Sequence, residues 1–156
     1  MKWLLLDFKS ANEPWFEHAE AAYLKKINYF INFETIHLKT NKADREQADI
    51  KIKFEEARLF EKLTSEDYII VFDEKGKKHD SVSFSKLIDK AGQSGKKRGV
   101  LILGGAYGLS DAVKNKATQT ISLSDLTMNH LVAELVVLEQ LYRAQTILNR
   151  IPYHNA

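Results

Sequence analysis

The segment Gly99-Val-Leu-Ile-Leu-Gly-Gly-Ala-Tyr-Gly108 sets the fold class of this sequence. Residues 99–103 form a short, continuous apolar run, which is typical of a strand buried on both faces within a parallel sheet. The run ends abruptly at the glycine loop 104–108, where the absence of Cβ atoms lets the backbone approach a ligand closely. The same glycines are equally compatible with a tight strand-to-helix turn that binds nothing. The pattern therefore predicts a central strand with a candidate ligand-binding turn at its carboxyl end.

Segments of strand and helix character alternate along the chain on either side of this strand. The predicted strands are residues 2–8, 33–39, 68–72, 99–103 and 120–122, the third of which stops at a polar turn over residues 73–76. Two long helices are predicted in the first half of the chain, one from an N-cap at Asn12 to about Phe30 and one from a cap at Asp44 to about Leu63. A third helix is predicted over residues 83–92, and a short fourth helix follows a cap at Ser110. The last predicted helix runs from near His130 to about Asn149. In the second helix, the apolar stripe is Ile50, Phe54, Ala57 and Leu63. Such alternation favours an α/β fold with a mostly parallel sheet flanked by helices, as a single domain over residues 1–156.

The composition narrows the range of functions. Lysine and arginine number 23 against 21 aspartates and glutamates, so any contact with nucleic acid has to come from local patches. The absence of cysteine excludes a disulfide framework, a thiolate nucleophile and a cysteine zinc site. The apolar run at residues 3–6 is too short for a signal sequence, and no other segment reaches the length of a membrane span. We therefore expect a soluble, cytoplasmic protein that does not contact membranes.

Three strand ends carry unusual sequences at the place where open α/β sheets bind ligands. They are Phe72-Asp73-Glu74, the glycine loop 104–108 and the segment Leu123-Ser-Asp-Leu-Thr-Met128. The last of these alternates small polar and apolar residues, so it can offer backbone N–H and C=O groups to a flat heterocycle. It can equally be a connection in which Ser124 or Thr127 caps the following helix. That final helix is apolar around much of its circumference, which indicates burial on more than one side and favours a subunit interface.

Four motifs in a fixed order give the sequence a specific resemblance to a known family. They are Leu101-Ile-Leu-Gly-Gly-Ala-Tyr-Gly-Leu109, Ile121-Ser-Leu-Ser-Asp-Leu-Thr127, Leu138-Glu-Gln-Leu-Tyr-Arg-Ala144 and the terminal Pro152-Tyr-His154. With them the whole chain resembles the SPOUT methyltransferases and, within that class, the ribosomal RNA large subunit methyltransferase H family. The resemblance implies a C-terminal trefoil knot in which residues 121–130 thread through a loop, and a homodimer packed through the last helix. It also implies methyl transfer from S-adenosyl-L-methionine to N3 of a pseudouridine in large-subunit (23S) ribosomal RNA, within the assembled ribosome.

The resemblance also assigns roles to individual residues. The cofactor-binding positions occupy the same three strand ends and fall on Phe72, Gly104, Leu123, Ser124, Asp125, Leu126, Thr127 and Met128. The substrate-side positions, taken together as the catalytic set, fall on His130, Arg143, Tyr153 and His154. No metal is needed for the reaction, because the cofactor carries its own activated methyl group.

The N3 imino proton has to leave before that nitrogen can attack, and histidine is the natural base near neutral pH. We expect His154 to take this role from a tail folded over the pocket, with Tyr153 stacking on the base and Arg143 binding a phosphate or orienting the pyrimidine. A solvated terminal histidine and a simple pair of Arg143 with Glu139 at helical spacing are the plainer alternatives. The two mid-chain histidines, His37 and His79, are expected to be ordinary surface residues.

Two positions depart from the family pattern. Asn129 stands where a proline is common, which predicts a change in how the knot loop is held. Glu134 stands where an arginine is common, which predicts a reversed charge near the RNA surface. The basic stretches Lys75–His79 and Lys96–Arg98 are of a kind that is usually just solvated, but here both are expected to flank the site and contact phosphates.

Three other functions stay open at this point. A SPOUT methyltransferase acting on transfer RNA would share the fold, although the Tyr-His ending argues against it. A dimeric RNA-binding module without catalysis is given room by Glu134. A nucleotide-dependent oxidoreductase would place phosphates at residues 104–108 and a ribose at Asp125, but the glycine spacing differs from the dinucleotide fingerprint.

Overall fold

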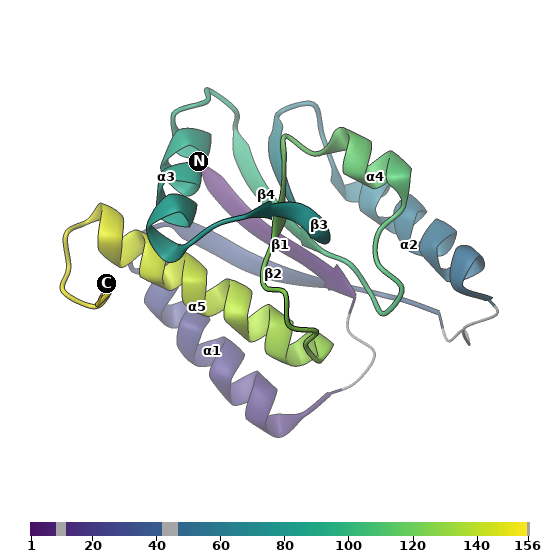
Figure 1. Cartoon of the computed structure of the whole chain (residues 1–156), viewed down its shortest axis with the longest axis horizontal. Helices are drawn as coiled ribbons and strands as arrows, with labels where there is room; N and C mark the ends of the chain where they lie inside the picture. The colour runs from purple at the N-terminus through teal and green to yellow at the C-terminus, as the bar shows by residue number, and fades with distance from the viewer. Residues whose placement is uncertain (9–11, 42–46, 156) are drawn as a thin grey trace.

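The computed structural model describes residues 1–8, 12–41 and 47–155, and its centre is a five-stranded sheet (Figure 1). The strands lie in the order β2-β1-β4-β3-β5, and every neighbouring pair is parallel. Their bounds are Lys2–Phe8 for β1, Asn32–Leu38 for β2, Asp67–Lys78 for β3, Arg98–Leu103 for β4 and Gln119–Ser122 for β5. The predicted α/β class is confirmed. Because the strands are parallel, their carboxyl ends share one edge of the sheet, where α/β proteins bind ligands.

Helices cover both faces of this sheet (Figure 1). One layer consists of α1 (Pro14–Asn28), α3 (Ser81–Gly92) and α5 (His130–Leu148), and the other of α2 (Ala48–Lys62) and α4 (Asp111–Lys116). Side chains of β1 alternate between the layers: Trp3 and Leu5 join the first core, whereas Leu4 and Leu6 join the second. All four are buried. This burial on both faces is why the strands read as continuous apolar runs.

β3 is longer than the sequence predicted, and the polar turn expected at residues 73–76 is wrong. The strand continues to Lys78 because its second half pairs again with β5 after an irregularity between Phe72 and Lys77. At Gly76 the backbone of β3 passes so close to β5 that a Cβ would lie 2.5 Å from the backbone carbonyl carbon of Ile121. We call this close approach the crossing of β3 and β5. A glycine is therefore needed for β3 to lie this close to β5. The threading of residues 121–130 through a loop stays a prediction.

The buried face of α2 differs from the predicted apolar stripe. Lys51, Glu55 and Leu59 are buried, whereas Ile50 is 61% exposed. The two polar side chains can be buried because each has a partner. The ammonium group of Lys51 lies 5.6 Å from the centre of the Tyr107 ring, and the carboxylate of Glu55 accepts a hydrogen bond from a threonine hydroxyl. The spacing of apolar residues therefore predicted the wrong buried face for this helix.

The helix ends agree only partly with the predicted caps. α1 begins after Glu13 without a side-chain cap, so the cap predicted at Asn12 is wrong. Ser110 caps α4 as predicted, by accepting the Val113 N–H at 3.2 Å. The cap predicted at Asp44 lies outside the described residues. Among the helices in the described part of the chain, none combines the length and the apolarity needed to cross a membrane.

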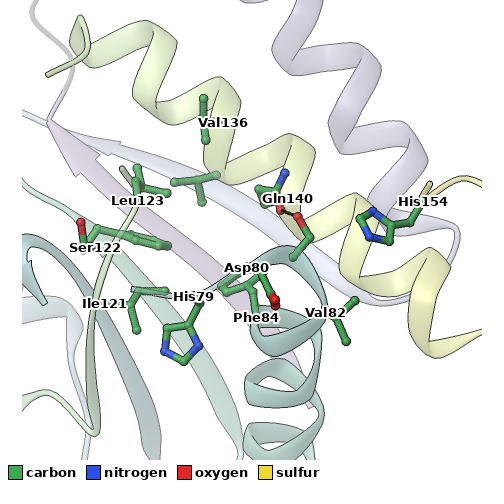
Figure 2. A pocket seen from close by; sticks show the side chains of 13 residues that line it. His79, Asp80, Val82, Phe84, Ile121, Ser122, Leu123, Val136, Gln140 and His154 are labelled. Carbon is green, nitrogen blue, oxygen red and sulfur yellow. Dashed lines mark hydrogen bonds between the residues drawn. The ribbon is translucent and has the colours of Figure 1, made fainter. Parts of the chain in front are cut away.

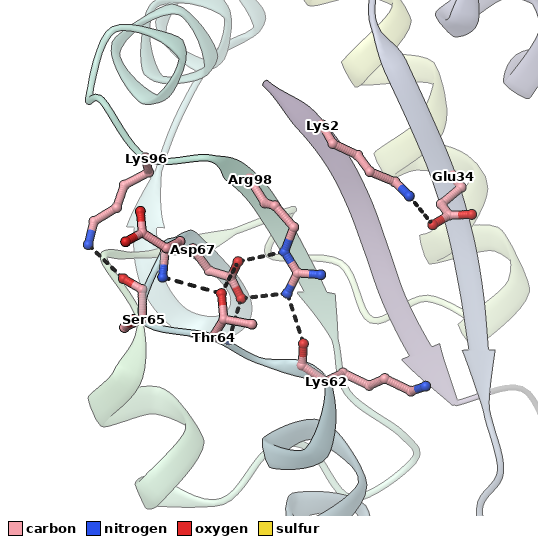
Figure 3. A network of polar contacts seen from close by, with 9 residues as sticks. Lys2, Glu34, Lys62, Thr64, Ser65, Asp67, Lys96 and Arg98 are labelled. Carbon is pink, nitrogen blue, oxygen red and sulfur yellow. Dashed lines mark hydrogen bonds and ion pairs between the residues drawn. The ribbon is translucent and has the colours of Figure 1, made fainter.

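The amino-terminal edge of the sheet carries an ion-pair network (Figure 3). The buried carboxylate of Asp67, at the start of β3, accepts from Nε and Nη2 of Arg98 at 2.7 and 2.8 Å and from the Thr64 N–H at 2.7 Å. Burial alone would raise the pKa of Asp67, but the hydrogen bonds from Arg98 and Thr64 outweigh it and hold that pKa below its ordinary value. Arg98 starts β4, so the basic stretch 96–98 lies opposite the carboxyl ends of the strands. The expectation that it flanks the ligand site is therefore wrong.

Candidate active site

A cavity of about 710 Å³ lies at the carboxyl edge of the sheet. Phe72, Gly104 and the segment 124–128 all line it: Phe72 lies within β3, Gly104 follows β4, and the segment follows β5. Leu123 lines a smaller cavity of about 150 Å³, together with Phe72 and most of the same segment. The structure thus brings together all eight residues predicted to bind the cofactor. The parallel topology explains why three distant sequence segments share one cavity.

The glycine loop is held tightly by its own packing. A Cβ on Gly104 would lie 2.8 Å from Cγ of Leu109, and a Cβ on Gly105 would lie 2.6 Å from a carboxylate oxygen of Glu55. Gly108 has a φ of 81°, which glycine adopts without strain, and its N–H donates to the Gly105 carbonyl at 3.1 Å. The loop is therefore a tight turn, and it also presents bare backbone to the cavity.

The segment 123–128 is ordered by local hydrogen bonds. The hydroxyl of Ser124 accepts from the Leu126 N–H at 2.9 Å, and Asp125 forms an ion pair with Nζ of Lys78 at 2.6 Å. Asp125 thus already has a partner, and α4 starts only at residue 111, three residues after the glycine loop. A dinucleotide site needs a helix directly after its glycines, so the oxidoreductase alternative does not fit.

Asn129 is the N-cap of α5. Its side-chain oxygen accepts a hydrogen bond from the Leu131 N–H at 3.0 Å. The caps predicted at Ser124 and Thr127 are therefore wrong. This departure from the family pattern has a local physical role, because a proline side chain has no acceptor for such a cap.

A second cavity, of about 490 Å³, lies between the end of β5, the start of α3 and α5 (Figure 2). Phe72 and Leu123 line it, and His154 from the C-terminal tail lines it as well. Because Phe72 lines both of these cavities, the two adjoin at this residue. A flat base in the second cavity would thus lie between the predicted cofactor site and the tail.

The tail folds back onto α5 and forms a compact polar cluster around Arg143. Nη2 of Arg143 donates to Oε1 of Glu139 at 2.6 Å, Nη1 donates to Nδ1 of His154 at 3.1 Å, and the guanidinium lies 4.6 Å from the centre of the Tyr153 ring. The Tyr153 hydroxyl donates to the same Glu139 oxygen at 3.1 Å. Burial, followed by the bond to Glu139, raises the pKa of Tyr153. The pair of Arg143 with Glu139 expected from helical spacing is present, but it is one part of a larger group.

His130 lies apart from this cluster. Its Nε2 is 3.1 Å from Oδ2 of Asp7 at the carboxyl end of β1, and His130 is absent from the linings of the two cavities described above. Glu134, one helical turn further on, is 0% exposed, so the expectation that it reverses a charge at the RNA surface is wrong. The structure therefore gathers three of the four substrate-side residues and places the fourth among buried charged groups.

His37 contacts the same group and is half-buried, so it is not the ordinary surface residue that we expected. Its Nδ1 lies 2.5 Å from Oδ1 of Asp7, and its Nε2 lies 2.8 Å from Oε2 of Glu20. These hydrogen bonds raise the pKa of His37 to about 10. Burial, followed by the charge of Asp7, raises the pKa of Glu134 to about 9. The sequence did carry a signal, since Asp7 is the one charged residue in the run 3–8 and a buried charge needs a partner.

His79 is the second histidine that sequence reasoning passed over. It lines the second cavity (Figure 2), its Nδ1 is hydrogen-bonded to Oγ of Ser83 at 2.5 Å, and its Nε2 is buried without a hydrogen-bond partner among the described residues. No periodicity singles this residue out, because it lies at the junction of β3 and α3.

Comparison with known proteins shows the family to which this chain belongs. Residues 1–154 match the family model described as "Predicted SPOUT methyltransferase". A Bdellovibrio bacteriovorus protein named Ribosomal RNA large subunit methyltransferase H is 43% identical over 155 residues, covering 99% of each chain. A protein of the same name from Cytophaga hutchinsonii is 34% identical, covering 99% of this chain and 100% of the relative. Among solved structures, the SpoU methyltransferase AviRb from Streptomyces viridochromogenes in complex with the cofactor AdoMet is 14% identical, with a TM-score of 0.46, and the match covers 97% of this chain and 58% of that one. The chain therefore belongs to the SPOUT methyltransferases and, among them, to the ribosomal RNA large subunit methyltransferase H family.

Proposed function

We propose that this chain transfers the methyl group of S-adenosyl-L-methionine to N3 of a pseudouridine in 23S ribosomal RNA. The observation that carries the proposal is the pair of adjoining cavities that share Phe72, one at the glycine loop and the other at His154. A cofactor in the first and a base in the second would be neighbours, as direct methyl transfer requires. The names of the relatives support ribosomal RNA as the substrate. Work on ribosomal RNA implies a cytoplasmic location.

The first cavity suits S-adenosyl-L-methionine in size and chemistry. Its volume of about 710 Å³ lies within the range of small-molecule sites, roughly 300–1,000 Å³. Gly104 and Gly105 line this cavity without side chains, so their backbone groups are bare there and can bind polar parts of the cofactor. Phe72, Leu126 and Met128 offer apolar surface for the adenine ring. When bound, the cofactor supplies the activated methyl group.

Removal of the N3 proton needs a base, and His154 is not ready for this task in the conformation seen here. An arginine side chain only donates hydrogen bonds, so Nδ1 of His154 is the acceptor and the neutral ring carries its proton on Nε2. We infer that a substrate phosphate draws Arg143 away and frees Nδ1 to take the N3 proton. Arg143 would then bind the RNA and also release the base, while Tyr153 would stack on the pyrimidine.

Dimerisation through α5 and action on the assembled ribosome belong to the same proposal. Val132 and Leu148 of α5 are 41% and 37% exposed, and Ile151 just after the helix is 41% exposed. A second copy of the chain would bury these apolar side chains. The net charge of only +2 supports a shaped ribosomal surface, rather than a general charge field, as the source of most RNA contacts.

The test is methyl transfer from labelled S-adenosyl-L-methionine to ribosomes from a strain that lacks this protein. The wild type should label one pseudouridine of 23S RNA. Gly104→Val, whose added side chain would collide with Leu109 and distort the glycine loop, should lose both cofactor binding and transfer. His154→Ala should keep cofactor binding and lose transfer by about 100-fold or more. Label in transfer RNA instead would support the first alternative function, and RNA binding without turnover would support the non-catalytic module.

A further inference from the structure

Five titratable side chains from four elements converge at the carboxyl edge of the sheet. Asp7 lies on β1, His37 lies opposite it on β2, Glu20 comes from α1, and His130 and Glu134 come from the first turns of α5. Asp7 and Glu134 are both 0% exposed. Within the described residues, none of the three carboxylates forms a salt bridge with a lysine or an arginine. Among the side chains that the structure describes, these three carboxyl groups are therefore opposed by two imidazole rings.

Glu134 is the member of this cluster that the protein leaves unsatisfied. Both of its carboxylate oxygens are buried and lack a hydrogen-bond partner in the part of the chain that the structure describes. Its ion-pair contact is long, at 3.7 Å from Nδ1 of His37. Burying a carboxyl group without a partner is costly, so such a group points to a ligand that binds it.

We propose that Asp7, His130 and Glu134 hold one divalent metal ion of the zinc class. In this trio the potential ligand atoms all lie within 4.8 Å of one another. Nε2 of His130 and Oδ2 of Asp7 are 3.1 Å apart, close to the separation of about 3.3 Å between two ligands of a tetrahedral zinc ion. A rotation of the Glu134 carboxylate toward them completes three protein ligands, and water takes the fourth position.

The surroundings of the trio favour this class of ion. Imidazole nitrogen suits zinc and its transition-metal neighbours, whereas magnesium and calcium prefer shells of oxygen alone. His37 bridges Oδ1 of Asp7 and Oε2 of Glu20 through its two ring nitrogens, which fixes a ligating carboxylate in place. A second compact trio consists of Glu20, His37 and Glu134. Both nitrogens of His37 are already hydrogen-bonded there, so we assign the ion to the first trio.

The ion would tie the start of α5 to β1 beside the cofactor segment. α5 begins at His130, two residues after Met128, so fixing His130 also fixes the end of the segment 123–128. This role is structural and lies outside the methyl-transfer chemistry. It also gives the departure at Glu134 a function, since the arginine common at this position could not bind a cation.

Metal binding is measured on the purified full chain after removal of metal with a chelator. Calorimetric titration with Zn²⁺ should show one equivalent bound, and Co²⁺ should give absorption bands of a site with nitrogen and oxygen ligands. Glu134→Gln, which keeps the shape but replaces one potential ligand oxygen with an amide group, should weaken Zn²⁺ binding by about 100-fold or more. Glu17→Gln and His18→Ala change exposed residues of the same types on α1, and they should bind Zn²⁺ like the wild type.

A wild-type protein that takes up neither Zn²⁺ nor Co²⁺ would overturn the proposal, and so would a Glu134→Gln variant with unchanged affinity. If that variant does not fold by circular dichroism, His130→Ala replaces it, because the His130 side chain is 25% exposed and its loss should be tolerated. The readout does not involve methyl transfer. Failure of the proposed function would therefore leave the metal result standing, and the reverse holds as well.

Discussion

Replacing Gly76 with alanine tests whether β3 crosses β5 as the structure shows. The added Cβ would lie 2.5 Å from the carbonyl carbon of Ile121 and 2.7 Å from its Cα and its nitrogen. Carbon atoms in contact normally stay about 3.5–4.0 Å apart, so the overlap is about 1 Å and involves three backbone atoms that cannot rotate aside. We expect a loss at the upper end of the usual cost of overpacking, about 3 kcal/mol in the free energy of unfolding.

Urea unfolding, followed by circular dichroism, measures this loss. Gly92→Ala is the matched control, because a Cβ there meets nothing within 4 Å. It lies at the end of α3, where alanine should leave the free energy of unfolding unchanged or raise it by up to about 1 kcal/mol. A Gly76→Ala variant within about 0.5 kcal/mol of the wild type would refute the crossing of β3 and β5.

Four further substitutions, at three positions, probe the ion pair at the amino-terminal edge and the tail cluster. Asp67→Asn should lower the free energy of unfolding by about 3 kcal/mol near neutral pH, because it removes the buried partner of Arg98. The folded-state pKa of Asp67 lies below its ordinary value of 3.8. The extra stability of the wild type over the variant should therefore be full above pH 3.8 and be lost as the pH falls through the lowered pKa. Urea unfolding as a function of pH measures this difference. Tyr153→Phe keeps the ring beside Arg143 but loses the bond to Glu139, so kcat/KM for ribosomes should fall less than about 10-fold, whereas Tyr153→Ala should cost about 100-fold. Arg143→Lys keeps the charge without the planar fork and should lower kcat/KM by about 10-fold, while the Kd for cofactor, measured by calorimetry, stays unchanged.

The fold class could be predicted because its signals are local. Strands such as 99–103 are buried on both faces, so their continuous apolar runs stand out, and alternation with helices then implies a parallel sheet. The cavity at the carboxyl edge of the sheet could be predicted for a related reason, since parallel strands place their carboxyl ends at one edge. The extension of β3 could not, because the charged residues after Phe72 read as a turn until β5 supplies their partner.

The buried charged cluster was missed because it depends on tertiary contacts. Asp7 and His130 are 123 residues apart, and nothing in the sequence near either residue indicates that they meet. Glu134 was placed near the RNA surface from the family pattern, in which an arginine is common at this position, and that prediction failed at the same cluster. The buried face of α2 was predicted wrongly for the same reason, since Glu55 is buried through a partner that lies elsewhere in the chain. The structure thus corrected the sequence-based predictions mainly at polar residues that are buried through distant contacts.

The most direct test of the central claim is mass spectrometry of 23S ribosomal RNA from a strain that lacks this protein and from the same strain after its return. The account predicts a single pseudouridine that is unmethylated in the first strain and gains 14 Da, the mass of one methyl group in place of a proton, in the second, but not when the returned protein carries Gly104→Val. Identical 23S RNA in the two strains would contradict it.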